Sequence, residues 1–223
     1  MRILLRVLWG IYGFLWLGGL ITGGVSTLTP WAAPLFLIIA GTVAILENKA
    51  AWRALLISAA CGYLFELMGV HTGYPFGRYQ YTEVLAPSIA GVPIAMTLAW
   101  LILIDFVRGM TKDILWGSLL MAGIDLVIDP LAAGPLGYWE WFEHGRYFGI
   151  PAINYVGWVL TSILILAILP KHPPRRAYVG WSVVGFFTVL AVEKGLYLPA
   201  GIGLVLVLMP LYRVLWPKAE KAG

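Results

Sequence analysis

The sequence has few charged residues. Aspartate, glutamate, lysine and arginine make up 12% of its 223 residues, compared with about 25% in an average soluble domain. Hydrophobic residues account for 61%, so a water-soluble core is excluded and an integral membrane protein is indicated. There is a single cysteine, Cys61, which excludes an intrachain disulfide and any Cys-x-x-Cys motif.

The apolar residues occur in long runs separated by short clusters of charged or turn-forming residues. At roughly 20 residues per spanning helix, the chain has room for about eight spans and little else. We therefore predict an all-α fold: one polytopic transmembrane helix bundle, a single integral membrane domain over residues 1–223. The first run resembles a signal peptide, but no convincing small-x-small cleavage site follows, so we expect a retained helix. The helices are expected near residues 3–24, 31–46, 51–70, 89–107, 114–129, 151–169, 177–193 and 196–216.

The net charge of +4 comes from basic residues in the short gaps between these runs. With eight spans, Arg78, Arg146 and Lys194 fall on one side, and the other 12 of the 15 basic residues fall on the side of both termini. The positive-inside rule then places both termini in the cytoplasm. We predict a multi-pass protein of the cytoplasmic (inner) membrane, with lipid and no nucleic acid as its surroundings.

Four acids lie in or at the ends of the apolar runs. Because a charged side chain at the bilayer centre costs roughly 2.5 to 3.5 kcal/mol, such an acid usually faces a cavity, a partner or a proton path. Glu66 is near the outer end of the third run, and Asp125 and Asp129 are at the outer end of the fifth. Residues four apart share a helix face, so the two aspartates should point the same way. Asp105, at the cytoplasmic end of the fourth run, is expected to pair with Arg108.

Two long connections on the outer side, residues 71–88 and 130–150, carry aromatic, glycine and proline residues. Such loops are either interfacial belts or lids over a site. With the acids beneath them, they predict a polar pocket under an aromatic roof. The candidate catalytic residues are Glu66, Asp125, Asp129 and Asn154. The candidate substrate-binding residues are His71, Arg78, Tyr79, Tyr81, Trp139, Trp141, Arg146 and Trp158.

An internal repeat supports lids over a site. Gly91–Trp100 aligns without gaps to Gly149–Trp158, and a Gly-Arg-Tyr triplet precedes each segment, at 77–79 and 145–147. Two spans per unit would give both copies one orientation, so that their sites face a common axis. The repeated helix pairs would cover residues 51–107 and 114–169.

At these residues the chain resembles the CruF-type carotenoid hydratases. The matching segments are ELMGVHTGYPFGRYQY at 66–81, DLVIDP at 125–130, GYWEW at 137–141 and YFGIPAINYVGW at 147–158. The resemblance implies addition of water to the terminal C1′,C2′ double bond of an acyclic carotenoid end group. Its substrates would be γ-carotene, lycopene or bisanhydrobacterioruberin.

Hydration of such a bond requires a proton donor, a tertiary cation and a water molecule, but no cofactor and no metal. From the residues, we expect a protonated Glu66 or Asp125 to be the general acid. Asp129, with Asn154 and Tyr79, would hold the water and take its second proton. Aromatic faces of Trp139, Trp141 or Tyr81 would stabilise the cation. Glycines on the helices would let a flat polyene pass close to the backbone: Gly62, Gly69, Gly91 and Gly157.

Two alternatives stay open. Asp125-x-x-x-Asp129 also resembles the acidic motif of an intramembrane prenyltransferase, in which carboxylates hold Mg²⁺ against a diphosphate. A proton-linked transporter of lipid or carotenoid would also keep acids within the membrane.

Overall fold

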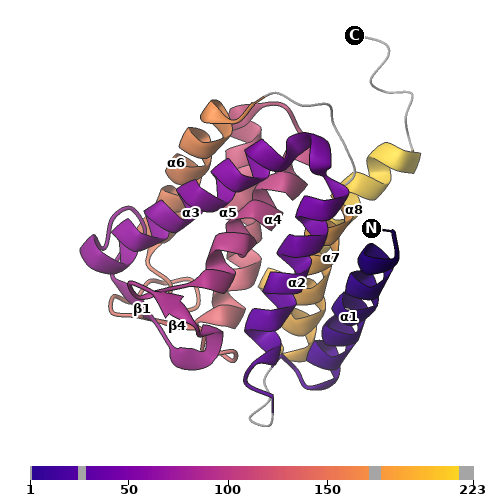
Figure 1. Cartoon of the computed structure of the whole chain (residues 1–223). Helices are drawn as coiled ribbons and strands as arrows, with labels where there is room; N and C mark the ends of the chain where they lie inside the picture. The colour runs from indigo at the N-terminus through magenta and orange to yellow at the C-terminus, as the bar shows by residue number, and fades with distance from the viewer. Residues whose placement is uncertain (1, 25–28, 171–176, 216–223) are drawn as a thin grey trace.

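The computed structural model describes residues 2–24, 29–170 and 177–215. This part of the chain folds into eight α-helices with four short strands in the connections (Figure 1). The eight helices confirm the eight apolar runs, and most predicted ends agree within about three residues. The helices are α1 Arg2–Ile21, α2 Ala32–Glu47, α3 Trp52–Thr72, α4 Ile94–Met110, α5 Ile114–Ala132, α6 Ala152–Ile168, α7 Tyr178–Glu193 and α8 Tyr197–Leu215.

Among the described residues, three helical segments are long and apolar enough to cross a membrane: Arg2–Ile21, Lys49–Thr72 and Ile114–Ala132. Several other helices are apolar but shorter. The number of eight spans and the cytoplasmic location of both termini therefore stay predictions. Five basic residues used for the orientation lie outside the described residues: Lys171, Arg175, Arg176, Lys218 and Lys221.

Helix α4 forms the centre of the bundle. Eleven of its residues are buried, and Trp100 and Leu101 are fully buried. Helix α6, in contrast, exposes Ile153, Val156, Leu160 and Leu164 along one face, since residues three and four apart lie on the same side of a helix. A contiguous apolar face of this kind is unfavourable in water, and it is compatible with contact with lipid.

Helix α5 continues through Pro130, whereas the sequence predicted an end at Asp129. Proline has no N–H to donate to the carbonyl four residues earlier, which leaves the Leu126 carbonyl without its helical partner. The Tyr147 hydroxyl donates a hydrogen bond to that oxygen at 2.9 Å. A side chain from the following loop thus replaces the missing bond, and the helix extends to Ala132.

The outer connections contain strands that the sequence analysis did not predict. Strand β1 (Tyr79–Tyr81) pairs antiparallel with β4 (Trp139–Trp141), so that Tyr79 is opposite Trp141 and Tyr81 is opposite Trp139. This ribbon lies at the lower end of the bundle in Figure 1. Strands β2 (Ser88–Ile89) and β3 (Val92–Pro93) form a small hairpin before α4, which is why α4 begins five residues later than predicted.

The helix glycines make room for side chains of the protein itself. A Cβ atom on Gly62 would collide with the Cβ and Cγ of Trp100, and one on Gly157 would meet the Pro75 carbonyl at 2.6 Å. The prediction that Gly62 and Gly157 provide space for a polyene is therefore wrong. Gly69 is similar, because a Cβ there would meet Tyr79.

Candidate active site

Glu66 is buried in α3, with 4% of its surface exposed, and its carboxyl group accepts three hydrogen bonds. The hydroxyls of Tyr79 and Tyr81 donate to Oε2 at 2.5 and 2.7 Å, and the Trp100 indole N–H donates to Oε1 at 2.8 Å. The donors come from β1 and α4. Hydrogen bonds to a carboxylate stabilise its charged form, so these three donors offset part of the cost of burying Glu66.

Asp129, on α5, also accepts three hydrogen bonds. The indole N–H groups of Trp139 and Trp141 donate to Oδ1 at 2.7 and 3.2 Å, and the Asn154 amide donates to Oδ2 at 2.7 Å. The same Asn154 nitrogen donates to Oδ2 of Asp125 at 2.6 Å. One amide thus bridges both aspartates, which confirms that they share a helix face.

The β1–β4 ribbon explains how these donors reach both acids. Alternate residues of a strand point to the same side, so each strand directs two rings to one face, separated by Gln80 in β1 and Glu140 in β4. The tyrosines of β1 reach Glu66 and the tryptophans of β4 reach Asp129. The exposed Gln80 and Glu140 hydrogen-bond each other on the opposite face.

The three carboxyl groups surround a cavity of about 20 Å³. A cavity needs roughly 10 to 15 Å³ of this kind of volume to hold one water molecule, so about one water fits among the acids. The lining is Glu66, Phe76, Tyr79, Tyr81, Met96, Asp125, Asp129, Trp139, Trp141, Asn154 and Trp158. We refer to it as the acid cavity.

A second cavity of about 40 Å³, the inner cavity, lies next to the acid cavity. Met96, Asp125, Trp139 and Trp158 line both. Its remaining walls are mainly aliphatic and aromatic, and include Trp100, whose ring stacks on Trp158 with centroids 4.4 Å apart and planes 14° apart. Among the described residues that line the inner cavity, Asp125 is the one site acid. Glu66 and Asp129 line the acid cavity but not the inner cavity.

The tyrosines of the ribbon stay protonated over a wide pH range. Burial, and then the charge of Glu66, raise the pKa values of Tyr79 and Tyr81 well above the ordinary value of 10. Both hydroxyls therefore remain hydrogen-bond donors to Glu66 at neutral and mildly alkaline pH.

The predicted site residues do not all reach the acid cavity. Glu66, Asp125, Asp129, Asn154, Tyr79, Tyr81, Trp139, Trp141 and Trp158 line it. His71, Arg78 and Arg146 do not: all three are exposed, and Arg78 pairs with Glu143 at 3.3 Å. Their placement in the pocket is corrected here. The β1–β4 pairing turns Tyr79 inward, which leaves the adjacent Arg78 on the solvent side.

Several residues of the site were not predicted. Trp100 donates to Glu66, and Met96 and Phe76 line the acid cavity. A signal for Trp100 was present, because the repeat aligns it with Trp158. Asp105 lies elsewhere, buried on α4, where it accepts a hydrogen bond from Asn48 at 2.9 Å; its pairing with Arg108 stays a prediction.

Fold and site together define a mostly helical protein with membrane-compatible helices and a shielded cluster of acids. A family model described as "carotenoid biosynthesis protein" matches residues 30–210. The chain therefore belongs to the carotenoid biosynthesis protein family, and the predicted resemblance to CruF-type hydratases is confirmed.

A curated relative supports this family. The chain is 30% identical, over 143 residues, to a bisanhydrobacterioruberin hydratase from Haloarcula japonica. The match covers 58% of this chain and 48% of the relative, so the chain spans about half the length of that protein. No solved structure shows a significant match to the chain.

Proposed function

We propose that the chain is a carotenoid hydratase, which adds water to the terminal C1′,C2′ double bond of an acyclic carotenoid end group. The observation that carries this proposal is the acid cavity, in which three carboxyl groups from two helices surround space for about one water. The hydratase relative and the family match support the same chemistry. The enzyme would be a hydro-lyase that needs no cofactor.

Asp125 is the proposed proton donor. Glu66 and Asp129 each accept three hydrogen bonds, whereas Asp125 accepts one from the described residues, from Asn154. Fewer donors leave its charged form less stabilised, so among the three acids Asp125 is best suited to hold a proton. It also faces the inner cavity, where an apolar end group could approach its O–H. Both observations support Asp125 over Glu66 as the donor.

The reaction then proceeds in two steps. Asp125 transfers its proton to the less substituted carbon, and the π electrons form the new C–H bond, which leaves a tertiary cation. The water in the acid cavity attacks that cation through oxygen, and Asp129 accepts the proton that the water releases. One water is consumed, and the two aspartates together hold as many protons as before.

The cation is stabilised by the surroundings of the inner cavity. Trp158 lines both cavities, and an indole face attracts a positive charge by about 0.5 to 2 kcal/mol. The carboxylate of Glu66 contributes a negative charge at the acid cavity. It acts at a distance and is held in place by Tyr79, Tyr81 and Trp100.

The surroundings of the acids favour hydration over prenyl transfer. A Mg²⁺ site needs several oxygen ligands that converge on the ion, but among the described residues no three acidic, histidine or cysteine side chains are placed to hold a metal ion together. The basic residues that could bind a diphosphate, Arg78 and Arg146, are exposed and do not line the acid cavity.

The test uses membranes that contain the protein, lycopene or γ-carotene, and ¹⁸O-labelled water, without added metal or nucleotide. We expect a product heavier by one water, with the label in a tertiary hydroxyl group, detected by mass spectrometry. A product that lacks the label, or activity only with Mg²⁺ and an isoprenyl diphosphate, would refute the proposal. Membranes containing the Asp125→Asn variant serve as the control.

A further inference from the structure

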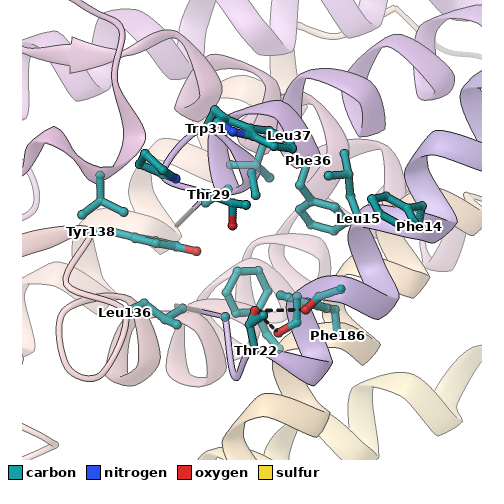
Figure 2. A pocket seen from close by; sticks show the side chains of 18 residues that line it. Phe14, Leu15, Thr22, Thr29, Trp31, Phe36, Leu37, Leu136, Tyr138 and Phe186 are labelled. Atoms are coloured by element: carbon teal, nitrogen blue, oxygen red, sulfur yellow. Dashed lines mark hydrogen bonds between the residues drawn. The ribbon is translucent and has the colours of Figure 1, made fainter. Parts of the chain in front are cut away.

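A third and much larger cavity lies between α1, α2 and α7, beside the loop that follows α5. Its volume is about 390 Å³, within the range of roughly 300 to 1,000 Å³ that is usual for small-molecule sites. Figure 2 shows aromatic and aliphatic side chains around it, among them Phe14, Leu15, Phe36 and Phe186. We refer to it as the outer cavity.

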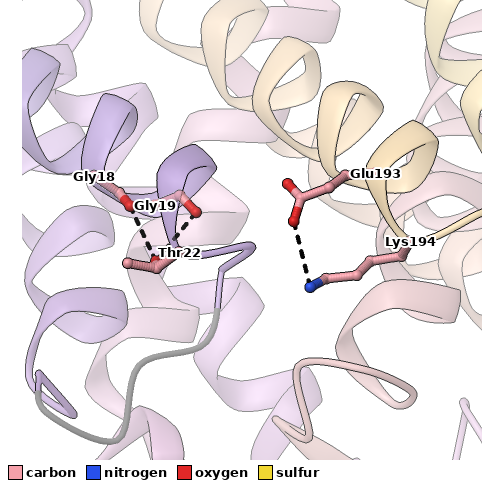
Figure 3. Close-up of polar contacts among 5 residues, drawn as sticks. All are labelled: Gly18, Gly19, Thr22, Glu193 and Lys194. Carbon is pink, nitrogen blue, oxygen red and sulfur yellow. Dashed lines mark hydrogen bonds and ion pairs between the residues drawn. The ribbon is translucent and has the colours of Figure 1, made fainter.

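Few polar side chains line the outer cavity: Thr22, Thr29, Trp31 and Tyr138. The Thr22 hydroxyl donates to the carbonyl oxygens of Gly18 and Gly19, at 3.0 and 3.3 Å. Glu193 and Lys194, near the end of α1, pair with each other at 3.5 Å (Figure 3). A polar ligand would thus find few partners here, so the lining favours an apolar one.

The outer cavity adjoins the inner cavity, and the two are separated by side chains that line both. Leu37, Tyr138 and Phe187 line both the outer and the inner cavity, and the inner cavity reaches Asp125. The three cavities therefore form one series that changes from wide and apolar to narrow and acidic. This is the order that a long hydrocarbon with one reacting end requires.

We propose that the outer cavity binds the polyene chain of the substrate, while the end group passes Leu37, Tyr138 and Phe187 to reach Asp125. This inference rests on the proposed hydration. The inner cavity, at about 40 Å³, admits only a slender end group, and the three side chains at its entrance set how far that group enters. Tyr138 lines both cavities and has its hydroxyl directed into the outer cavity (Figure 2), so we expect its side chain to influence which end groups enter.

The test fills the outer cavity without disturbing the fold. A Cβ on Gly18 meets no atom within 4 Å, and Gly18 lines the outer cavity, so Gly18→Phe places a ring in the cavity. Gly10, two turns earlier on α1, has equally open surroundings but does not line it, so Gly10→Phe is the matched control. Gly18→Leu provides a smaller obstruction in case the phenylalanine variant does not fold.

We expect Gly18→Phe to lower hydration of lycopene at least tenfold and Gly18→Leu to lower it less, whereas Gly10→Phe stays within twofold of the wild type. A short olefin with the same end group should be hydrated equally by all of them, because it does not need the outer cavity. Equal lycopene turnover in Gly18→Phe and Gly10→Phe would overturn the inference. So would equal loss for the short olefin.

A binding measurement separates this inference from the proposed function. In the Asp125→Asn background, purified protein is mixed with lycopene and passed through a sizing column, and the retained visible absorption is measured. Retention should fall at least fivefold with Gly18→Phe and remain with Gly10→Phe. Failure of the wild type to hydrate lycopene would refute the function alone, whereas unchanged retention in Gly18→Phe would refute the outer cavity as the polyene site.

Discussion

At the scale of single residues, the three site acids differ in the number of hydrogen bonds they accept. This difference leads to a specific expectation for Asp125→Asn. The variant cannot donate a carboxylic proton, and general acid catalysis typically contributes 10² to 10⁴-fold, so we expect turnover of lycopene to fall at least about 100-fold. Product formation in membranes, measured by chromatography, checks this.

The matched control is Asp105→Asn, which changes another buried acid of the bundle outside the acid cavity. We expect its turnover to stay within about twofold of the wild type. If Asp125→Asn kept near-normal turnover, or if both variants lost it equally, Asp125 would not be the proton donor.

A second expectation at this scale concerns pH and the ribbon tyrosines. Because the folded protein raises the pKa values of Tyr79 and Tyr81 above 10, this contribution to stability is complete below pH 10. It is lost as the pH rises above 10, where the unfolded chain ionises first. Thermal unfolding in detergent between pH 8 and 11 should show a steeper loss of stability above pH 10 in the wild type than in Tyr79→Phe. Equal slopes would contradict the assignment.

Some of these residues were predictable and others were not. Asp125, Asp129 and Asn154 could be grouped because helical spacing and opposite helix ends place them together. Arg78 was misplaced because the sequence does not reveal which face of the three-residue strand after it points inward. His71, in the last turn of α3, and Arg146, in the loop before α6, are exposed. The donors to the acids depend on that same orientation, so the aromatic roof was predicted but its N–H and O–H bonds were not.

At the scale of elements, α5 shows how a helix tolerates an internal proline. The Tyr147 hydroxyl takes the place of the missing N–H at the Leu126 carbonyl, so Tyr147→Phe leaves a carbonyl without a partner. Such a loss costs about 1 to 3 kcal/mol.

Pro130→Ala restores the N–H, so the double variant should recover part of this loss. Unfolding free energies of the wild type, both single variants and the double variant, from SDS titration, give the coupling energy. A coupling near zero would contradict this account, since residues that share a partner usually couple by 0.5 kcal/mol or more.

The helices themselves could be predicted because each is an apolar run between turn residues. The β1–β4 ribbon could not, because its strands are three residues long and their partners are 60 residues apart. The alternation Tyr-x-Tyr and Trp-x-Trp is typical of strands, but it is too short to indicate a pairing. Packing between the two connections decides it.

At the scale of the whole molecule, the proposed orientation places the acid end of the bundle on the outer side of the membrane. Two separate variants are made in a Cys61→Ser background, so that each carries a single thiol. His144→Cys places it in the connection after α5 and Lys112→Cys in the connection before α5, and both positions are exposed. A membrane-impermeant maleimide should label His144→Cys in intact cells and Lys112→Cys only after permeabilisation. The reverse pattern would show that the acids face the cytoplasm.

The proposed repeat of helix pairs also belongs to this scale. Gly91 and Gly149 have the same left-handed φ of 82°, and each is followed two residues later by the proline that precedes a helix, α4 or α6. These matching turns support the alignment of the two segments. The Gly-Arg-Tyr triplets do not correspond in position, because Tyr79 lies in β1 and contacts Glu66, whereas Tyr147 contacts Leu126.

The pairing of β1 with β4 makes the two outer connections interdependent. Insertion or deletion of one residue between a strand and the neighbouring helix would turn the two rings of that strand outward. One acid would then lose two hydrogen-bond donors together. Neither connection can therefore be replaced alone by that of a homologue. A chimaeric protein has to take both connections from the same parent. Changes in end-group preference should accordingly evolve at those residues of the inner and outer cavities that donate no hydrogen bond to the acids.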